Sequence, residues 1–138
     1  MDDGEQIRAL IHAYAERLDG GDLDGVAELF ADATWRSGGR TEVFRGVVLY
    51  GGKPNTKHVI TNVSVTIDGS DAATARSYFT VLQATPDLPL QPIIAGSYED
   101  AFAREDGTWR FSDRLIIVDL VGDLSHHMRM GDATPERT

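Results

Sequence analysis

The chain has 138 residues, enough for one domain with its own hydrophobic core. Acidic residues outnumber basic ones by 22 to 13, and the resulting formal charge of −9 disfavours binding to nucleic acid or to anionic membranes. The sequence contains no cysteine, which excludes disulfides, thiolate metal ligands and cysteine nucleophiles.

The chain opens with a helical pattern. Apolar residues recur at helical spacing over residues 4–19, and this predicts an amphipathic helix. Its apolar stripe consists of Ile7, Leu10, Ile11, Tyr14 and Leu18. The Gly20-Gly21 pair ends this helix, and Asp22 caps a second, shorter helix that extends to Phe30. The two helices are expected to form a hairpin.

The remainder of the chain has the pattern of strands. Short strands are predicted over 34–36 and 41–44, followed by irregular structure or a short helix over 46–55. Four long strands then span residues 56–67, 72–85, 93–104 and 108–120. Three prolines predict a loop over 86–92. The domain is expected to cover residues 1–122, with 123–138 as a polar C-terminal tail.

The order of the elements predicts the fold class. Helices before a run of antiparallel strands indicate an α+β fold. Strands of roughly 12 residues are longer than usual, and long strands tend to curl. We therefore predict a cone-shaped α+β barrel, in which N-terminal helices pack in the concave face of a strongly curved antiparallel or mixed sheet. A pocket between helices and sheet is the expected place for chemistry.

Four polar residues stand out at positions where the pattern is apolar. Tyr14 lies in the stripe of the first helix, and Asp19 ends that helix, where the helix dipole disfavours a carboxylate. His58 shares one strand face with Asn62, and Arg114 precedes an apolar run. Each has an ordinary structural explanation: a core tyrosine, a turn aspartate, an exposed histidine, an arginine that reaches the rim. In a curled sheet, however, all four could face a ligand.

Motifs for other chemistries are absent from the sequence. It contains neither a phosphate-binding glycine motif nor a serine nucleophile elbow. His126 and His127 could form a metal-binding site, but neighbouring histidines in a polar tail are more often solvated. We therefore predict neither a metal site nor a cofactor.

Three blocks of sequence carry a family pattern. They are Ile7-x-x-Leu10-Ile11-x-x-Tyr14-x-x-x-Leu18-Asp19, Thr56-Lys57-His58-x-x-Thr61-Asn62 and Gly96-Ser97-Tyr98-x-x-x-Phe102-x-Arg104-x-Asp106-Gly107. Together they resemble SnoaL-like proteins of the nuclear transport factor 2-like superfamily. The resemblance covers about residues 4–120. It implies the cone-shaped fold, and it leaves the reaction open because this fold hosts many chemistries.

Within the superfamily, the chain is most similar to the branch of scytalone dehydratase, bile-acid 7α-dehydratase and hexachlorocyclohexane dehydrochlorinase. These lyases pair a histidine on the first long strand with an aspartate that ends the first helix, and His58 and Asp19 occupy those positions. Tyr14 matches a tyrosine of the bile-acid enzyme, and Arg114 matches an arginine of the dehydrochlorinase. The resemblance implies that Asp19 orients His58 as a general base. Tyr14 would then donate a hydrogen bond to a carbonyl or departing group, and Arg114 would stabilise negative charge.

The function predicted on this basis is a small-molecule lyase that carries out a dehydratase-like elimination in an apolar pocket. One alternative is an isomerase or cyclase that acts on a polyketide- or steroid-like substrate with the same base. Another is a module of the same fold that binds a small ligand without catalysis. The residues expected to line the substrate site are Trp35, Asn62, Phe79, Ile94 and Tyr98.

The expected partners follow from composition and resemblance. The substrate should be small and apolar or aromatic, and neither nucleic acid nor membrane is expected. No apolar run reaches the roughly 20 residues of a membrane span, and the acidic start is unlike a signal peptide, so a cytoplasmic location is predicted. Proteins of the superfamily are usually dimers or trimers. A homo-oligomer is therefore expected, with Val59, Val63, Val65 and Ile67 available for either core or partner.

Overall fold

A computed structural model describes residues 1–36 and 47–128, apart from the side chains of Trp35 and Arg36. Its elements in chain order are α1 (Asp3–Asp19), α2 (Leu23–Leu29), β1 (Thr34–Arg36), β2 (Thr56–Asp68), β3 (Ala72–Thr85), β4 (Leu88–Glu105) and β5 (Thr108–Val121). The strand expected over 41–44 lies outside the described residues. Neither described helix is long and apolar enough to cross a membrane.

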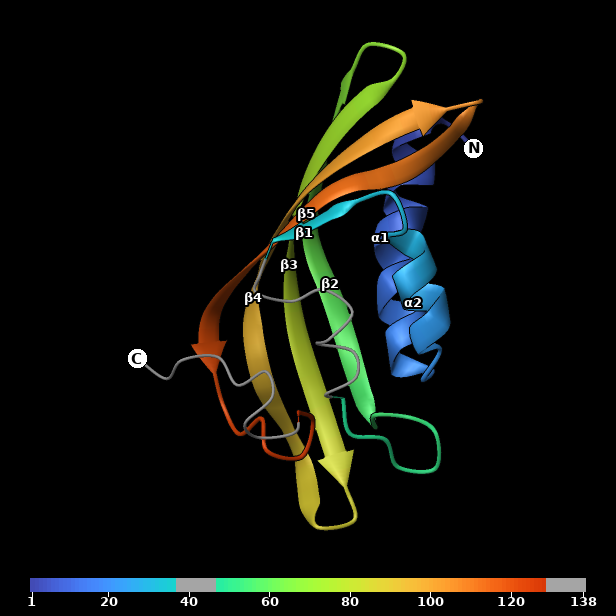
Figure 1. Ribbon diagram of the computed structural model, residues 1–138. Helices are drawn as coiled ribbons and strands as arrows, with labels where there is room; N and C mark the ends of the chain where they lie inside the picture. Colours follow the sequence, from blue (N-terminus) through green and yellow to red (C-terminus); the bar gives the residue numbers. More distant parts are fainter. Residues whose placement is uncertain (37–46, 129–138) are drawn as a thin grey trace.

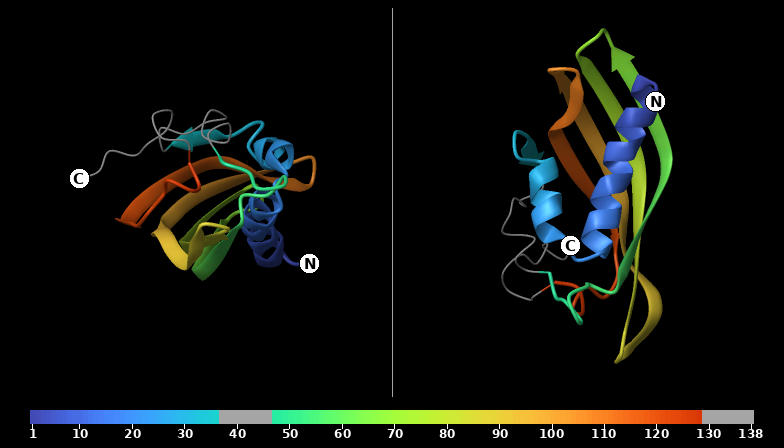
Figure 2. Two further views of the ribbon diagram at one scale, coloured as in Figure 1. Left: turned by 90° about the horizontal axis from the view of Figure 1, so that it is seen from below. Right: turned by 90° about the vertical axis from the view of Figure 1, so that its right-hand side faces the viewer.

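The strands form one sheet in the order β1-β5-β4-β3-β2. β1 pairs parallel to β5, and the other neighbours are antiparallel. The sheet is strongly curved, and both helices pack on the same face of it (Figure 1, Figure 2). The predicted α+β class is confirmed.

The helical hairpin forms as the sequence predicts. The Asp2 carboxylate accepts a hydrogen bond from the backbone N–H of Glu5, and Asp22 accepts one from Gly25, so each helix has an acidic N-cap. Gly21 adopts a φ of 81° between the helices. A side chain there would be strained, and its Cβ would lie 1.9 Å from the carbonyl oxygen of Gly52. The turn thus requires glycine.

The core lies between the helices and the sheet. One group of buried apolar side chains comprises Ile7, Ile11, Ala73, Ala75, Phe102, Trp109 and Phe111. A second group comprises Phe79, Val81, Ile93, Tyr98 and Leu124. The predicted site residues lie beside the second group, where Tyr14 and Leu18 of α1 pack with Val26 of α2.

A β-bulge in β2 decides which of its side chains face the helices. Thr61 pairs with Tyr78 but Ser64 pairs with Arg76, so β2 holds one extra residue at this point. Asn62 occupies the bulge with a φ of 55°, a left-handed conformation that asparagine tolerates. The inward face therefore switches from the side of His58 before the bulge to that of Val63 and Val65 after it. The prediction that inward and outward side chains alternate without interruption along this strand, with His58 and Asn62 on one face, is therefore wrong.

The loop predicted over 86–92 is also wrong. β3 and β4 are joined by a tight hairpin, and β4 already begins at Leu88. Pairing between β4 and β5 starts only at Ile94, so residues 88–93 have β3 as their sole strand neighbour among the described residues. Prolines in sheets are confined to such edge positions, where one side of the strand has no ladder.

The described part of the C-terminal segment, residues 122–128, packs against the rest of the structure. Leu124 and His127 are each 7% exposed. The Tyr50 hydroxyl donates to the carbonyl oxygen of His126 at 2.6 Å, and the N–H of Val48 donates to that of His127 at 2.8 Å. Residues 122–128 therefore cross the lower end of the sheet beside the segment that leads into β2 (Figure 1).

Candidate active site

His58 and Asp19 meet where the end of α1 packs on the start of β2. The Nδ1 of His58 lies 2.6 Å from Oδ1 of Asp19, and the backbone N–H of His58 donates to Oδ2 at 2.8 Å. The hydroxyl of Thr56 donates to Oδ1, also at 2.8 Å. The carboxylate thus receives donors from Thr56 and His58, two residues of the inward face of β2, and these bonds compensate its unfavourable place at the end of a helix.

These contacts fix the tautomer of His58. Burial alone would raise the pKa of Asp19, but the hydrogen bonds and the charge of His58, together with Thr56, hold that pKa below its ordinary value. An ionised carboxylate only accepts hydrogen bonds, so Nδ1 of His58 must carry the proton. In the neutral form of the ring, Nε2 then carries the lone pair. The His58 side chain is 6% exposed, so this lone pair does not face bulk solvent.

The ring of Tyr14, from α1, lies near the rings of both His58 and Tyr98. Its centroid is 6.1 Å from that of His58 and 5.8 Å from that of Tyr98. The two phenol hydroxyls share a hydrogen bond. Burial raises the pKa of both tyrosines, so both remain protonated donors near neutral pH.

Arg114 is fully buried behind these rings. Its guanidinium lies 3.8 Å from the ring centroid of Tyr98 and 4.5 Å from that of Tyr14. It donates two hydrogen bonds to Asp100, of 2.7 and 2.9 Å, and the side chain of Asp100 is equally buried. Within the described residues, the Nη1 of Arg114 has no hydrogen-bond partner. Arg114 thus joins the predicted cluster through the two tyrosines, with its charge balanced by Asp100.

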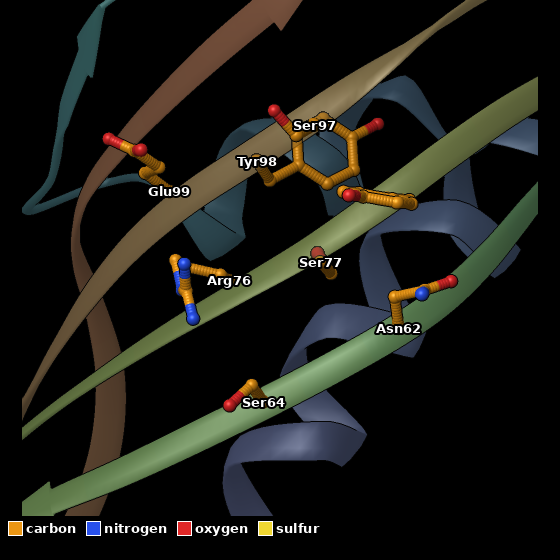
Figure 3. A pocket seen from close by; sticks show the side chains of 8 residues that line it. Asn62, Ser64, Arg76, Ser77, Ser97, Tyr98 and Glu99 are labelled. Carbon is orange, nitrogen blue, oxygen red and sulfur yellow. The ribbon is translucent and has the colours of Figure 1, made fainter.

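The predicted lining residues fall into different places. Phe79 stacks on Tyr98 with ring centroids 4.5 Å apart, and Ile94 packs against the same apolar group. The backbone of Trp35 pairs with Arg114, while its side chain lies outside the description. Asn62 does not join His58: because of the bulge it lies at a hollow of about 310 Å³ on the other face of the sheet, with Arg76, Ser97 and Glu99 (Figure 3).

Three site residues were missed by sequence reasoning. Asp100 had a usable signal, because it alternates with the buried Tyr98 and Phe102 along β4. Thr56 had a weaker signal, because it lies two residues before His58 and therefore on the same strand face. His127 had none, since it stands in a polar segment without periodicity. It is nevertheless buried beside His58, with ring centroids 6.4 Å apart.

An open groove reaches the His58–Asp19 pair from outside. It has a volume of about 550 Å³ and lies between the end of α1 and the start of β2. Its lining includes Glu16, Lys53, Asn55 and Lys57 besides the pair itself. Within residues 1–36 and 47–128, no group of three or more His, Cys, Asp or Glu side chains could hold a metal ion.

His127 makes the stability of the fold depend on pH. Burial, reinforced by the nearby His58, lowers the pKa of His127 to about 4. The unfolded chain binds a proton at this histidine below its ordinary pKa of 6.5, whereas the folded chain does not until about pH 4. The free energy of unfolding should therefore fall by up to about 3 kcal/mol as the pH drops through this window. Urea unfolding at several pH values measures the slope.

The neighbouring histidine supplies the control for this prediction. The side chain of His126 is 31% exposed, so His126→Gln should keep the pH dependence, while His127→Phe should flatten it. Equal slopes for the wild-type protein and His127→Phe would show that other groups cause the acid sensitivity.

Comparison with known proteins gives this geometry a family context. The family model of the SnoaL-like domain matches residues 1–115. No curated protein matches. Among solved structures, a variant of Rv3472, a protein of unknown function from Mycobacterium tuberculosis, is 27% identical with a TM-score of 0.68. That match covers 85% of this chain and 72% of that one.

Two structures from Novosphingobium aromaticivorans have the same fold at lower identity. One is provisionally assigned as a scytalone dehydratase; it is 18% identical, with a TM-score of 0.69, over 96% of this chain and 95% of that one. The other is provisionally assigned as an aromatic ring hydroxylase; it is 24% identical, with a TM-score of 0.68, over 90% and 95%. At such identities the likeness shows the fold alone. The chain belongs to the SnoaL-like domain family.

Proposed function

We propose that this protein is a lyase that removes water from a small β-hydroxy carbonyl compound, with His58 as the general base. The observation that carries the proposal is the contact of 2.6 Å between Nδ1 of His58 and Asp19. The contact directs the Nδ1 proton to Asp19 and leaves Nε2 for the substrate, while the largely buried ring of His58 lies 6.1 Å, centroid to centroid, from that of Tyr14. A histidine held in this way removes protons near neutral pH.

The reaction balances without a cofactor. Nε2 of His58 takes a proton from the carbon next to the carbonyl, and the C–H electron pair forms the new C=C bond. The C–O bond of the β-hydroxyl breaks, and the proton held by His58 goes to the departing oxygen. Water and an unsaturated carbonyl compound leave, and His58 is neutral again. Asp19 stabilises the imidazolium that exists between these two proton transfers.

The groups around His58 suit the charge that develops on the carbonyl oxygen. Tyr14 is a protonated donor beside His58, and the guanidinium of Arg114 lies behind its ring. Asp100 balances the charge of Arg114, so Arg114 acts on the site as the positive end of an ion pair, and this dipole is weakly screened because the site is buried. Phe79, Tyr98 and Ile94 offer apolar surface to a small, apolar or aromatic substrate.

Turnover of a β-hydroxytetralone tests the proposal. Loss of water from this bicyclic ketone gives a naphthol, whose fluorescence reports the reaction directly. We expect naphthol from the wild-type protein and background formation only from His58→Gln. A rearranged product would instead favour the isomerase or cyclase. Binding without any turnover would favour a ligand-binding module, and naphthol formation that persists in His58→Gln would refute His58 as the base.

The protein should also self-associate. Val59 and Tyr78 are 40% and 57% exposed on the face of the sheet opposite to the helices, where a partner would cover them. Light scattering should give a multiple of 15.1 kDa, and Tyr78→Lys should shift the mass toward the monomer. A wild-type mass of one chain would contradict the proposal.

A further inference from the structure

A second imidazole lies against His58, from a part of the chain remote in sequence. His127 follows the last strand, and its ring is inclined at 65° to that of His58, with ring centroids 6.4 Å apart. His127 is 7% exposed, although the residues around it are mostly polar. A histidine drawn this far into the domain requires a physical explanation.

The backbone around His127 is held firmly in place. The carbonyl oxygen of His126 accepts hydrogen bonds from the hydroxyl of Tyr50 and the side-chain amide of Gln83, at 2.6 and 3.1 Å. His127 itself bonds through its N–H to Leu124 and through its carbonyl oxygen to Val48. Leu124 in turn packs with the apolar group around Tyr98. The ring is therefore positioned by four hydrogen bonds and an apolar anchor, none of which uses the ring.

One nitrogen of the His127 ring lacks a polar partner in the part of the chain that the structure describes. Within residues 1–36 and 47–128, its buried Nδ1 makes no hydrogen bond. A buried polar atom without a partner is unfavourable, so such atoms are rare unless a ligand or water completes them. The titratable groups that face this ring are His58 and Asp19. Burial and the neighbouring His58 lower the pKa of His127 to about 4, so the ring is neutral near pH 7 and presents one donor and one acceptor nitrogen.

We propose that His127 is a substrate-binding residue that holds the hydroxyl group of the substrate opposite His58. At a centroid separation of 6.4 Å, one oxygen atom between the rings can hydrogen-bond to both. The neutral ring donates or accepts a hydrogen bond and transfers no proton, so the proton balance of the elimination is unchanged. This inference rests on the proposed function for the reaction itself, and it adds the residue that binds the departing hydroxyl group.

Binding of a matched pair of non-reacting probes tests this inference. β-Tetralol has the hydroxyl but no carbonyl, so it cannot eliminate water by this route, and tetralin is the same ring system without the hydroxyl. One neutral hydrogen bond corresponds to about a tenfold preference for the alcohol. Calorimetric titration of the wild-type protein should show this preference, and His127→Phe should abolish it by weakening tetralol binding alone. His126→Gln should keep it.

Two further measurements keep the inference open to refutation. If His127→Phe does not fold, His127→Gln retains a donor and should keep part of the preference. In the wild-type protein, the ring-nitrogen NMR signals of His127 should move on addition of tetralol and stay unchanged with tetralin. Equal weakening of both probes in His127→Phe would reduce His127 to a packing residue and overturn the inference.

These outcomes separate the inference from the proposed function. A hydroxyl preference that depends on His127, without turnover of β-hydroxytetralone, would keep the binding role and remove the lyase. Turnover that depends on His58, with an unchanged hydroxyl preference in His127→Phe, would keep the lyase and remove the role of His127.

Discussion

Replacement of Asp100 by asparagine is expected to lower the free energy of unfolding by about 3–5 kcal/mol. The side chains of Asp100 and Arg114 are both completely buried and share two hydrogen bonds of 2.7 and 2.9 Å. Burial alone would lower the pKa of Arg114, but the carboxylate of Asp100 raises it, so the guanidinium remains charged. Asparagine keeps the shape and one acceptor while it removes the compensating charge. An unpaired cation would then remain in the core.

The neighbouring Glu99 provides the control for this experiment. It lies on the exposed face of the same strand, so Glu99→Gln should change the free energy of unfolding by less than about 0.5 kcal/mol. The double variant Asp100→Asn/Arg114→Met removes both charges and should recover much of the loss, because the cost lies in the unpaired charge. Urea unfolding of the four proteins measures these differences. If Asp100→Asn lowers the free energy of unfolding by less than about 1 kcal/mol, then water or a dissolved anion compensates the charge of Arg114.

The ion pair also links the stability of the fold to the candidate site. Arg114 contacts the rings of Tyr14 and Tyr98 from behind, and Tyr14 lies beside His58. Displacement of the guanidinium would therefore move the tyrosines as well as weaken the core. For this reason the activity of an Asp100 variant is informative only alongside its stability.

The sequence allowed the local elements and the meeting of two distant residues to be predicted. The 3.6-residue period and the Gly20-Gly21 pair give α1 and its end, and strand alternation gives β3 with its bounds. The resemblance pointed to His58 and Asp19, and the structure brings them within 2.6 Å. Asp19 stands at the end of a helix, where a carboxylate is unfavourable, and this anomaly was the local indication that it has a hydrogen-bond partner.

The wrong predictions share a physical cause. Contacts between distant parts of the chain determine strand register, strand ends and burial where the local sequence pattern allows more than one outcome. The bulge at Asn62 depends on how β2 aligns with β3, and no feature of β2 alone requires it. Pro92 is typical of a loop in the sequence, but in the structure it lies in β4 where that strand pairs with β3 alone among the described strands. His127 becomes a core residue only because the chain returns beside Val48. Such long-range contacts have no signature in a single stretch of sequence.

Asp19→Asn is expected to lower the kcat for elimination by about 10²–10⁴-fold while the protein stays folded. An asparagine can present its NH₂ group to Nδ1 of His58, which would favour the opposite tautomer and place the proton on Nε2. The base would then be lost although the imidazole stays in place. Thr56→Val is the matched control, because it removes one donor to Asp19 and leaves the contact with His58 intact.

The combination of the two changes distinguishes a working pair from two independent residues. If Asp19 acts through His58, then Asp19→Asn/His58→Gln should lose little more activity than the worse of the single variants, because the base is already disabled. Independent contributions would multiply instead, and the double variant would lose the product of the two factors. Such a multiplicative loss, or full activity in Asp19→Asn, would mean that the short contact between these side chains serves the fold and not the reaction.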